Sequence, residues 1–142
     1  MITRRDLMVA GAAAVAAQAL AARAADAPAS SGDPAQVFTR AAAECVYAGE
    51  ACMQHCLTLL ASGDKTLGEC ASMVNQMLAV CRAVGPIADA KGKYIRSVAR
   101  LCLEVCTDCE RVCRQHAEQH AICKTCADAC AATVAAAKPL AA

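Results

Sequence analysis

Twelve cysteines carry the chemistry of this chain, and four of them lie close together in one stretch. Residues 101–115 read LCLEVCTDCERVCRQ, with thiols at steps of four, three and four. At about 100° of turn per residue, these thiols fall within roughly 60° of one helix face, and the charged residues between them point elsewhere. The stretch therefore predicts an amphipathic helix whose buried stripe is sulfur, where leucine normally lies. Its thiols are Cys102, Cys106, Cys109 and Cys113.

The remaining cysteines fit three further helices, because the chain is rich in alanine and poor in β-branched residues, a composition that favours helix over sheet. Asp33 and Asp64 are expected N-caps, and Pro34 suits the first helical position. Ser62-Gly63, Gly85-Pro86 and Lys138-Pro139 are expected helix ends. We expect helices over residues 34–61, 65–84, 87–116 and 120–138. Joined by short loops, they predict an all-α, antiparallel up-down-up-down four-helix bundle with a cysteine-lined core over residues 34–138, followed by a tail at 139–142.

The inward stripes of these helices are rich in sulfur. They carry Cys45, Cys52 and Cys56 on the first helix, Cys70, Met73, Met77 and Cys81 on the second, and Cys123, Cys126 and Cys130 on the fourth. With a rise of about 1.5 Å per residue, the sulfur atoms sort into successive layers along the bundle. The layers are Cys56, Cys70, Cys113 and Cys123, then Cys52, Met73, Cys109 and Cys126, then Met77, Cys106 and Cys130, then Cys45, Cys81 and Cys102. The interior is therefore predicted to be a continuous column of sulfur ligands.

Binding of a soft metal explains such a column better than the alternatives. Cysteines three or four apart on one helix project side by side, which suits the S–S torsion of a disulfide poorly. Structural zinc usually takes four ligands in one compact cluster, and iron–sulfur clusters usually take cysteines from loops. Soft Cu(I) accepts thiolate, thioether and imidazole ligands, and helical cysteine pairs four apart suit it. An iron–sulfur or zinc-binding exported protein and a disulfide-stapled structural bundle remain as alternatives.

Charge balance predicts the stoichiometry of copper. Two thiolates around one Cu(I) leave a net negative charge, and several such sites stacked in a dry core are unfavourable. Bridging thiolates, with about one copper per cysteine, make the interior neutral. We therefore expect Cu(I) to bind as multiple ions per chain.

Two methionines and three histidines are candidate ligands beside the cysteines. Met73 and Met77 interrupt a cysteine stripe on its own face, so their thioethers are placed to bind copper. His55, His116 and His120 are expected near one mouth of the thiol column, where neutral imidazoles would admit the metal. Imidazole ligands release copper on acidification, because protons compete for the same nitrogen.

The N-terminus has the pattern of an export signal. Arg4 and Arg5 precede an apolar run, and Ala22-Arg23-Ala24 offers small residues for cleavage, so residues 1–24 resemble a cleaved twin-arginine signal peptide. The apolar run is shorter than the roughly 20 residues that a membrane span needs, so we expect no membrane anchor in the mature form. A flexible segment over residues 25–33 would then precede a periplasmic or otherwise exported domain.

Composition excludes several function classes. The formal net charge is +1, which argues against a nucleic-acid partner bound through charge. The sequence has no glycine-rich phosphate loop, no serine nucleophile motif and no paired carboxylates on an apolar face. We therefore expect a metal-binding protein and not an enzyme.

The cysteine pattern resembles that of the bacterial copper storage proteins. The resemblance covers residues 34–137 and is most specific in C-x3-C-x2-C-x3-C, followed by H-A-E-Q-H and C-x2-C-x3-C. It implies Cu(I) storage in a four-helix bundle that folds with or without metal, often as a homotetramer. It also implies that exported members supply copper to extracytoplasmic enzymes, with methane monooxygenase the suggested client in methane oxidisers.

Overall fold

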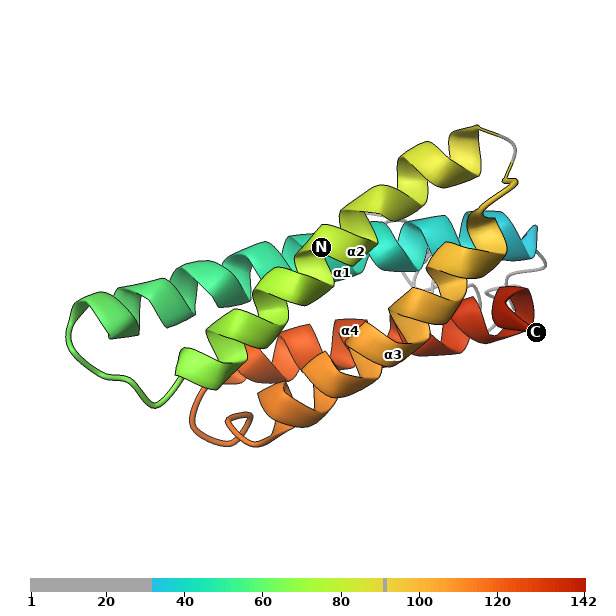
Figure 1. The fold of residues 1–142 in the computed structure, drawn as a ribbon. Helices are drawn as coiled ribbons and strands as arrows, with labels where there is room; N and C mark the ends of the chain where they lie inside the picture. The colour runs from blue at the N-terminus through green and yellow to red at the C-terminus, as the bar shows by residue number, and fades with distance from the viewer. Residues whose placement is uncertain (1–31, 91) are drawn as a thin grey trace, which may run out of the picture. The chain divides into compact units, whose positions relative to one another are not determined.

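The computed structural model describes residues 32–90 and 92–142, and these form four helices. They are α1 (Pro34–Ala61), α2 (Gly68–Asp89), α3 (Ile95–Arg114) and α4 (Ala121–Ala141). Each helix packs on the next along the chain, and α4 packs back on α1 (Figure 1). The predicted all-α, up-down-up-down bundle is confirmed. The predicted signal peptide and residues 25–31 lie outside the described residues.

Local signals set both ends of α1 where the sequence predicts them. The Asp33 carboxylate accepts a hydrogen bond from the N–H of Ala35 at 3.2 Å, and Pro34 takes the first helical position. After the last turn, Gly63 has a φ of 89°, a left-handed conformation that glycine adopts without strain.

Helix α2 begins later and ends later than predicted. Asp64 does not cap it, because its carboxylate accepts the N–H of Thr66 at 2.9 Å and the hydroxyl of Thr66 at 2.6 Å in the preceding turn. The helix also runs through Gly85-Pro86 to Asp89. Pro86 removes one helical hydrogen bond, but Ile87, which follows it, is half-buried and packs against the core. Tertiary packing therefore outweighs the local stop signal.

Helices α3 and α4 also differ from prediction at their ends. Gly92 has a φ of 75°, which no α-helix accommodates, so α3 begins only at Ile95. Pro139 lies inside α4. The guanidinium groups of Arg96 and Arg100 donate to the backbone carbonyls of Ala142 and Ala141, which satisfies acceptors that the end of a helix leaves free.

The core has two chemically different parts. At one end, which we call the apolar end, the start of α1 and α3 meets the end of α2 and α4. Its buried side chains are Phe38, Ala42, Val84, Val98, Ala99 and Ala137. The opposite end carries the α1–α2 and α3–α4 connections, and we call it the histidine end. None of the helices that the structure describes is both long and apolar enough to cross a membrane.

Candidate metal centre

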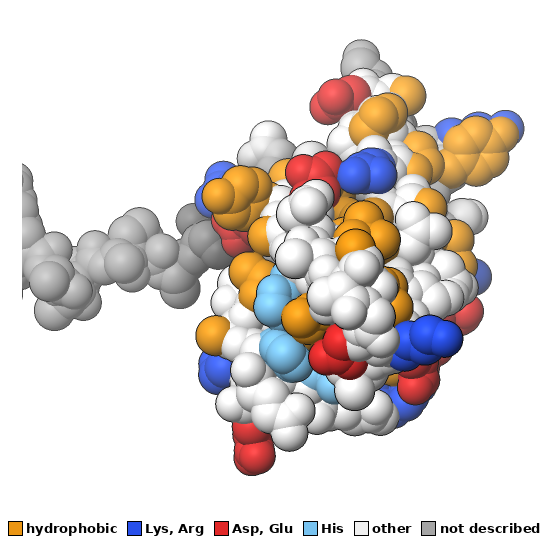
Figure 2. Space-filling model, turned by 90° about the vertical axis from the view of Figure 1, so that its left-hand side faces the viewer, with side chains coloured by type: hydrophobic (Ala, Val, Ile, Leu, Met, Phe, Trp, Pro, Cys, Tyr) orange, Lys and Arg blue, Asp and Glu red, His pale blue; other side chains and the backbone are white. Residues whose placement is uncertain are grey.

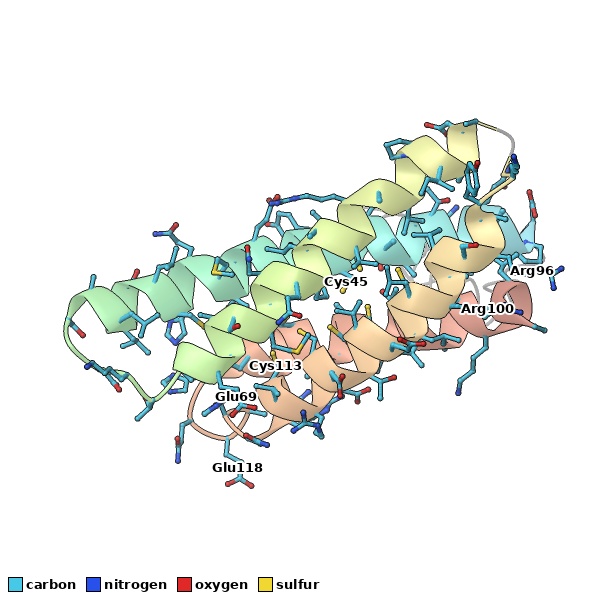
Figure 3. All side chains as sticks on the ribbon, in the orientation of Figure 1. Cys45, Glu69, Arg96, Arg100, Cys113 and Glu118 are labelled. Carbon is cyan, nitrogen blue, oxygen red and sulfur yellow. The ribbon has the colours of Figure 1, made fainter. Side chains whose placement is uncertain are left out.

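All twelve cysteines are buried inside the bundle as free thiols. Eleven have no exposed surface, and Cys81 is 2 % exposed. Figure 3 shows sulfur atoms between the ribbons, with Cys45 and Cys113 labelled among them. The predicted cysteine-lined core is confirmed.

The thiols contact one another across helices. The Sγ atoms of Cys70 and Cys113 are 3.6 Å apart, as are those of Cys81 and Cys106, and both pairs join α2 to α3. Cys45 and Cys130 are 3.7 Å apart and join α1 to α4. Cys52 and Cys123 make a second α1–α4 contact at 4.0 Å. Each contact is short enough for one metal ion to bridge both sulfur atoms after a small side-chain rotation.

Four groups of three thiols have all their Sγ atoms within 4.8 Å of one another. We call them triads, and they are Cys52/Cys56/Cys70, Cys52/Cys113/Cys126, Cys109/Cys126/Cys130 and Cys45/Cys106/Cys130. Consecutive triads share one cysteine, so they form an unbroken series from the histidine end inward. Cys81, which contacts Cys106, extends the series toward the apolar end.

The layers are staggered rather than flat. Cys70 meets Cys113, its predicted neighbour, but Cys52 belongs to a triad with Cys113, which was predicted one layer away. Side chains on antiparallel helices lean in opposite directions along the bundle, because each leans toward the N-terminus of its own helix. This lean brings neighbouring layers into contact and makes the column continuous.

Hydrogen bonding between thiols and burial shift the pKa values of these cysteines in opposite directions. The S–H of Cys113 lowers the pKa of Cys70 to about 3, and the S–H of Cys106 lowers the pKa of Cys102 to about 4. Burial raises the pKa of Cys56 to about 12 and that of Cys123 to about 11.

The thiols with a lowered pKa are distributed along the column. Hydrogen bonds from neighbouring thiols also lower the pKa of Cys45, first from Cys106, and that of Cys126, first from Cys109. Each triad contains one of the thiols with a lowered pKa, namely Cys70, Cys45 or Cys126. The thiolate is the form that binds soft metals, and a lowered pKa favours the thiolate form of one ligand in each triad.

The two candidate methionines lie in different surroundings. The Met77 side chain is fully buried, and its Sδ accepts the S–H of Cys45 at 3.4 Å, so its thioether lies against a triad. Met73 is half-buried at the edge of the core, and Val74 is fully buried on the inward stripe.

Gly49 makes room for the Met77 side chain, a role of Gly49 that was not predicted from the sequence. A Cβ at Gly49 would lie 2.5 Å from the Cε of Met77 and 2.9 Å from Cδ2 of Leu78. A glycine inside a long helix is the sequence signal of such a close approach.

The histidines gather at the histidine end, where Figure 2 shows their side chains together at the surface. His55 Nε2 and His120 Nδ1 are 3.1 Å apart, and the two rings lie 5.0 Å apart at 60°. The backbone N–H of His120 donates to the carbonyl of His116, so all three histidines lie close to one turn. All are half-buried, and His55 directly precedes Cys56 of the first triad.

Comparison with protein families agrees with this geometry. The family model described as "Copper storage protein" matches residues 31–142, which include every described helix. The chain belongs to the copper storage protein family. The family and the clustered thiols together point to copper as the metal of this column, and the family is one of storage rather than catalysis. A search of curated proteins gave no match.

Proposed function

We propose that this copper storage protein binds many Cu(I) ions, on the order of one per cysteine, through thiolates that bridge neighbouring ions. The observation that carries the proposal is the sharing of cysteines between consecutive triads. A shared thiol bridges two metal ions, and a series of shared thiols supports a chain of ions. Isolated single-ion sites would not share ligands.

The chemistry of the interior favours Cu(I) over the harder or divalent metals. The triads contain only thiol sulfur, which is the softest side-chain donor, and they exclude water. Bridging thiolates in a one-to-one ratio with Cu(I) leave the core neutral, whereas divalent ions in the same ratio would bury a large positive charge. The iron–sulfur, zinc and disulfide alternatives are tested below.

Copper enters at the histidine end in this proposal. The half-buried imidazoles of His55, His116 and His120 lie at the histidine end, where His55 directly precedes Cys56 of the first triad, and in this proposal they bind the ion before the thiols do. Met77 completes a mixed thiolate and thioether site with Cys45, and Met73 supplies a weaker ligand at the edge of the core. At the apolar end, Phe38 and Val84 are fully buried and offer no ligand.

We further propose that the stored copper serves an extracytoplasmic copper enzyme, or buffers copper outside the cytoplasm. This part rests on the twin-arginine pattern of residues 1–24 and on the resemblance to exported members of the family. Methane monooxygenase is the suggested client in methane-oxidising bacteria. A homo-oligomer, with a tetramer as the family's frequent form, is the proposed assembly.

Anaerobic titration of the reduced protein with Cu(I) tests the central claim. Saturation on the order of twelve equivalents, one for each cysteine, is expected, with growing ultraviolet Cu–S absorbance and no visible colour. Saturation at one or two equivalents would refute multiple-ion storage. Brown protein would indicate an iron–sulfur centre, and fewer than twelve titratable thiols in denaturant without reductant would indicate disulfides. Tighter binding of Zn²⁺ than of Cu(I) would favour the zinc alternative.

A further inference from the structure

A pocket on the side of the bundle reaches the thiol column far from the histidines. It has a volume of about 250 Å³ and lies between α1 and α2. Its lining residues are Thr39, Ala43 and Val46 of α1 and Cys81, Arg82 and Gly85 of α2. We call it the lateral pocket.

Small residues and a proline explain why the pocket stays open. A Cβ built at Gly85 would meet no atom within 4 Å, so no neighbouring side chain occupies the space beside it. Ala43 contributes only a methyl group from the facing helix. Pro86 has no N–H to donate to the carbonyl of Arg82, which loosens the helix at this turn.

The lateral pocket is lined by Cys81, the one cysteine that is not completely buried. Cys81 retains 2 % of its surface exposed, and the other eleven cysteines, all within the described residues, retain none. Its Sγ lies 3.6 Å from that of Cys106, which belongs to the triad deepest in the bundle. The pocket therefore connects solvent with the end of the column most distant from the histidine end.

The rim carries a positive charge. The guanidinium of Arg82 has five N–H donors, and the structure gives it one hydrogen bond, from Nη2 to Glu50 at 2.9 Å. The hydroxyl of Thr39 already donates to the carbonyl of Ala35 at 2.8 Å. The remaining lining is apolar, so a small molecule that enters the pocket would be recognised by the guanidinium of Arg82 beside Cys81. This combination suits a small anionic thiol, which offers a carboxylate to Arg82 and sulfur to the metal.

We propose that the lateral pocket is a second exchange site, where a small anionic thiol removes Cu(I) from Cys81 or delivers it there. The proposal rests on the storage of many Cu(I) ions. In the exchange, the incoming sulfur forms a bond to Cu(I), the bond from copper to Cys81 Sγ breaks, and Cys81 takes up the proton that the incoming thiol gives up. Copper remains Cu(I), so the step needs no oxidant or reductant.

Blocking the pocket tests the proposal. Ala43→Leu places a larger side chain at the pocket, and Ala132→Leu makes the same change at an exposed position of α4 away from it. Fully loaded proteins are mixed with excess glutathione, an anionic thiol, and the copper that stays bound to the protein is measured with time after the small thiol is removed by gel filtration. We expect Ala43→Leu to slow release about tenfold, the change that a barrier about 1.4 kcal/mol higher produces, while Ala132→Leu matches wild type. Equal release rates for the two variants would overturn the exchange site.

A second variant tests the recognition of the anion. Arg82→Gln keeps a polar side chain and removes only an exposed ion pair, so the fold is retained. Release by glutathione should slow several-fold, and release by the neutral thiol 2-mercaptoethanol should be unchanged. An equal effect on both thiols, or on neither, would overturn the role of Arg82. Wild type that holds only one or two copper ions would instead refute the storage function, so the two failures are distinguishable.

Discussion

Replacing Gly49 by alanine should destabilise the apo protein, although alanine is the better helix former. The added methyl group would lie 2.5 Å from Cε of Met77 and 2.9 Å from Cδ2 of Leu78, both well inside van der Waals contact. Both neighbours are buried, with exposed fractions of 0 % for Met77 and 3 % for Leu78. The methyl group can therefore be accommodated only if the two side chains repack, and Met77 moves away from Cys45.

The magnitude follows from two opposing effects. Overpacking of a core typically destabilises by about 1–3 kcal/mol, and the change from glycine to alanine inside a helix stabilises by about 1 kcal/mol. The expected net loss in the free energy of unfolding is about 1 kcal/mol. In a Met77→Ala background the clash with Cε is gone and the close contact with Leu78 remains, so the same Gly49→Ala change should destabilise less and come close to neutral. The size of the effect therefore depends on the residue at position 77.

Denaturant unfolding of the reduced apo proteins, followed by far-ultraviolet circular dichroism, measures these differences as a double-mutant cycle. Gly68→Ala is a control, because a Cβ there would meet no atom within 4 Å, and its stability should equal or exceed that of wild type. If Gly49→Ala alone stabilises the protein as Gly68→Ala does, then Met77 and Leu78 repack freely. That result would refute the claim that a glycine at position 49 is needed to make room for the Met77 side chain.

Three further outcomes are expected. Phe38→Ala should lower the free energy of unfolding of the apo protein by about 3–5 kcal/mol in denaturant unfolding. The number of Cu(I) ions bound in a titration should stay unchanged, and a lower number would show that the apolar end takes part in binding. Cys56 and Cys123 stay protonated in the folded state up to pKa values of about 12 and about 11, whereas in the unfolded chain they ionise near 9.0. Their stabilisation is complete below pH 9 and is lost as the pH rises toward 12, so the apo denaturation midpoint should fall above pH 9, and a constant midpoint would contradict the assignment. His55→Ala and His120→Ala should slow Cu(I) loading in stopped-flow experiments without reducing the final count, and unchanged loading rates would exclude these histidines from uptake.

The sequence was sufficient for features that depend on local signals or on helical spacing. Asp33, Pro34 and Gly63 act on the backbone next to them, so both ends of α1 could be predicted. The cysteine stripes also followed from spacing alone, because a period of about 3.6 residues fixes which side chains share a face.

Features that depend on neighbouring helices could not be predicted in this way. Pro86 signals a helix end locally, and α2 continues because Ile87, after the proline, packs against the core. Met73 and Val74 differ by one residue around the helix, and only the packing of α2 against its neighbours places Val74 at the centre and Met73 at the edge. The stagger of the triads has the same origin, since it depends on how side chains of antiparallel helices lean toward one another.

The triad of Cys45, Cys106 and Cys130 draws its members from α1, α3 and α4, which belong to the two different helical hairpins of the chain. A metal ion bound there joins the hairpins as a cross-link does, and the bundle must release that ion before it can open. The rate of unfolding should therefore fall as copper accumulates. The rate of proteolysis should fall as well, because proteases cleave the unfolded chain. Copper-loaded protein would be degraded more slowly than apo protein. The amount of the protein would then follow the copper supply through turnover alone.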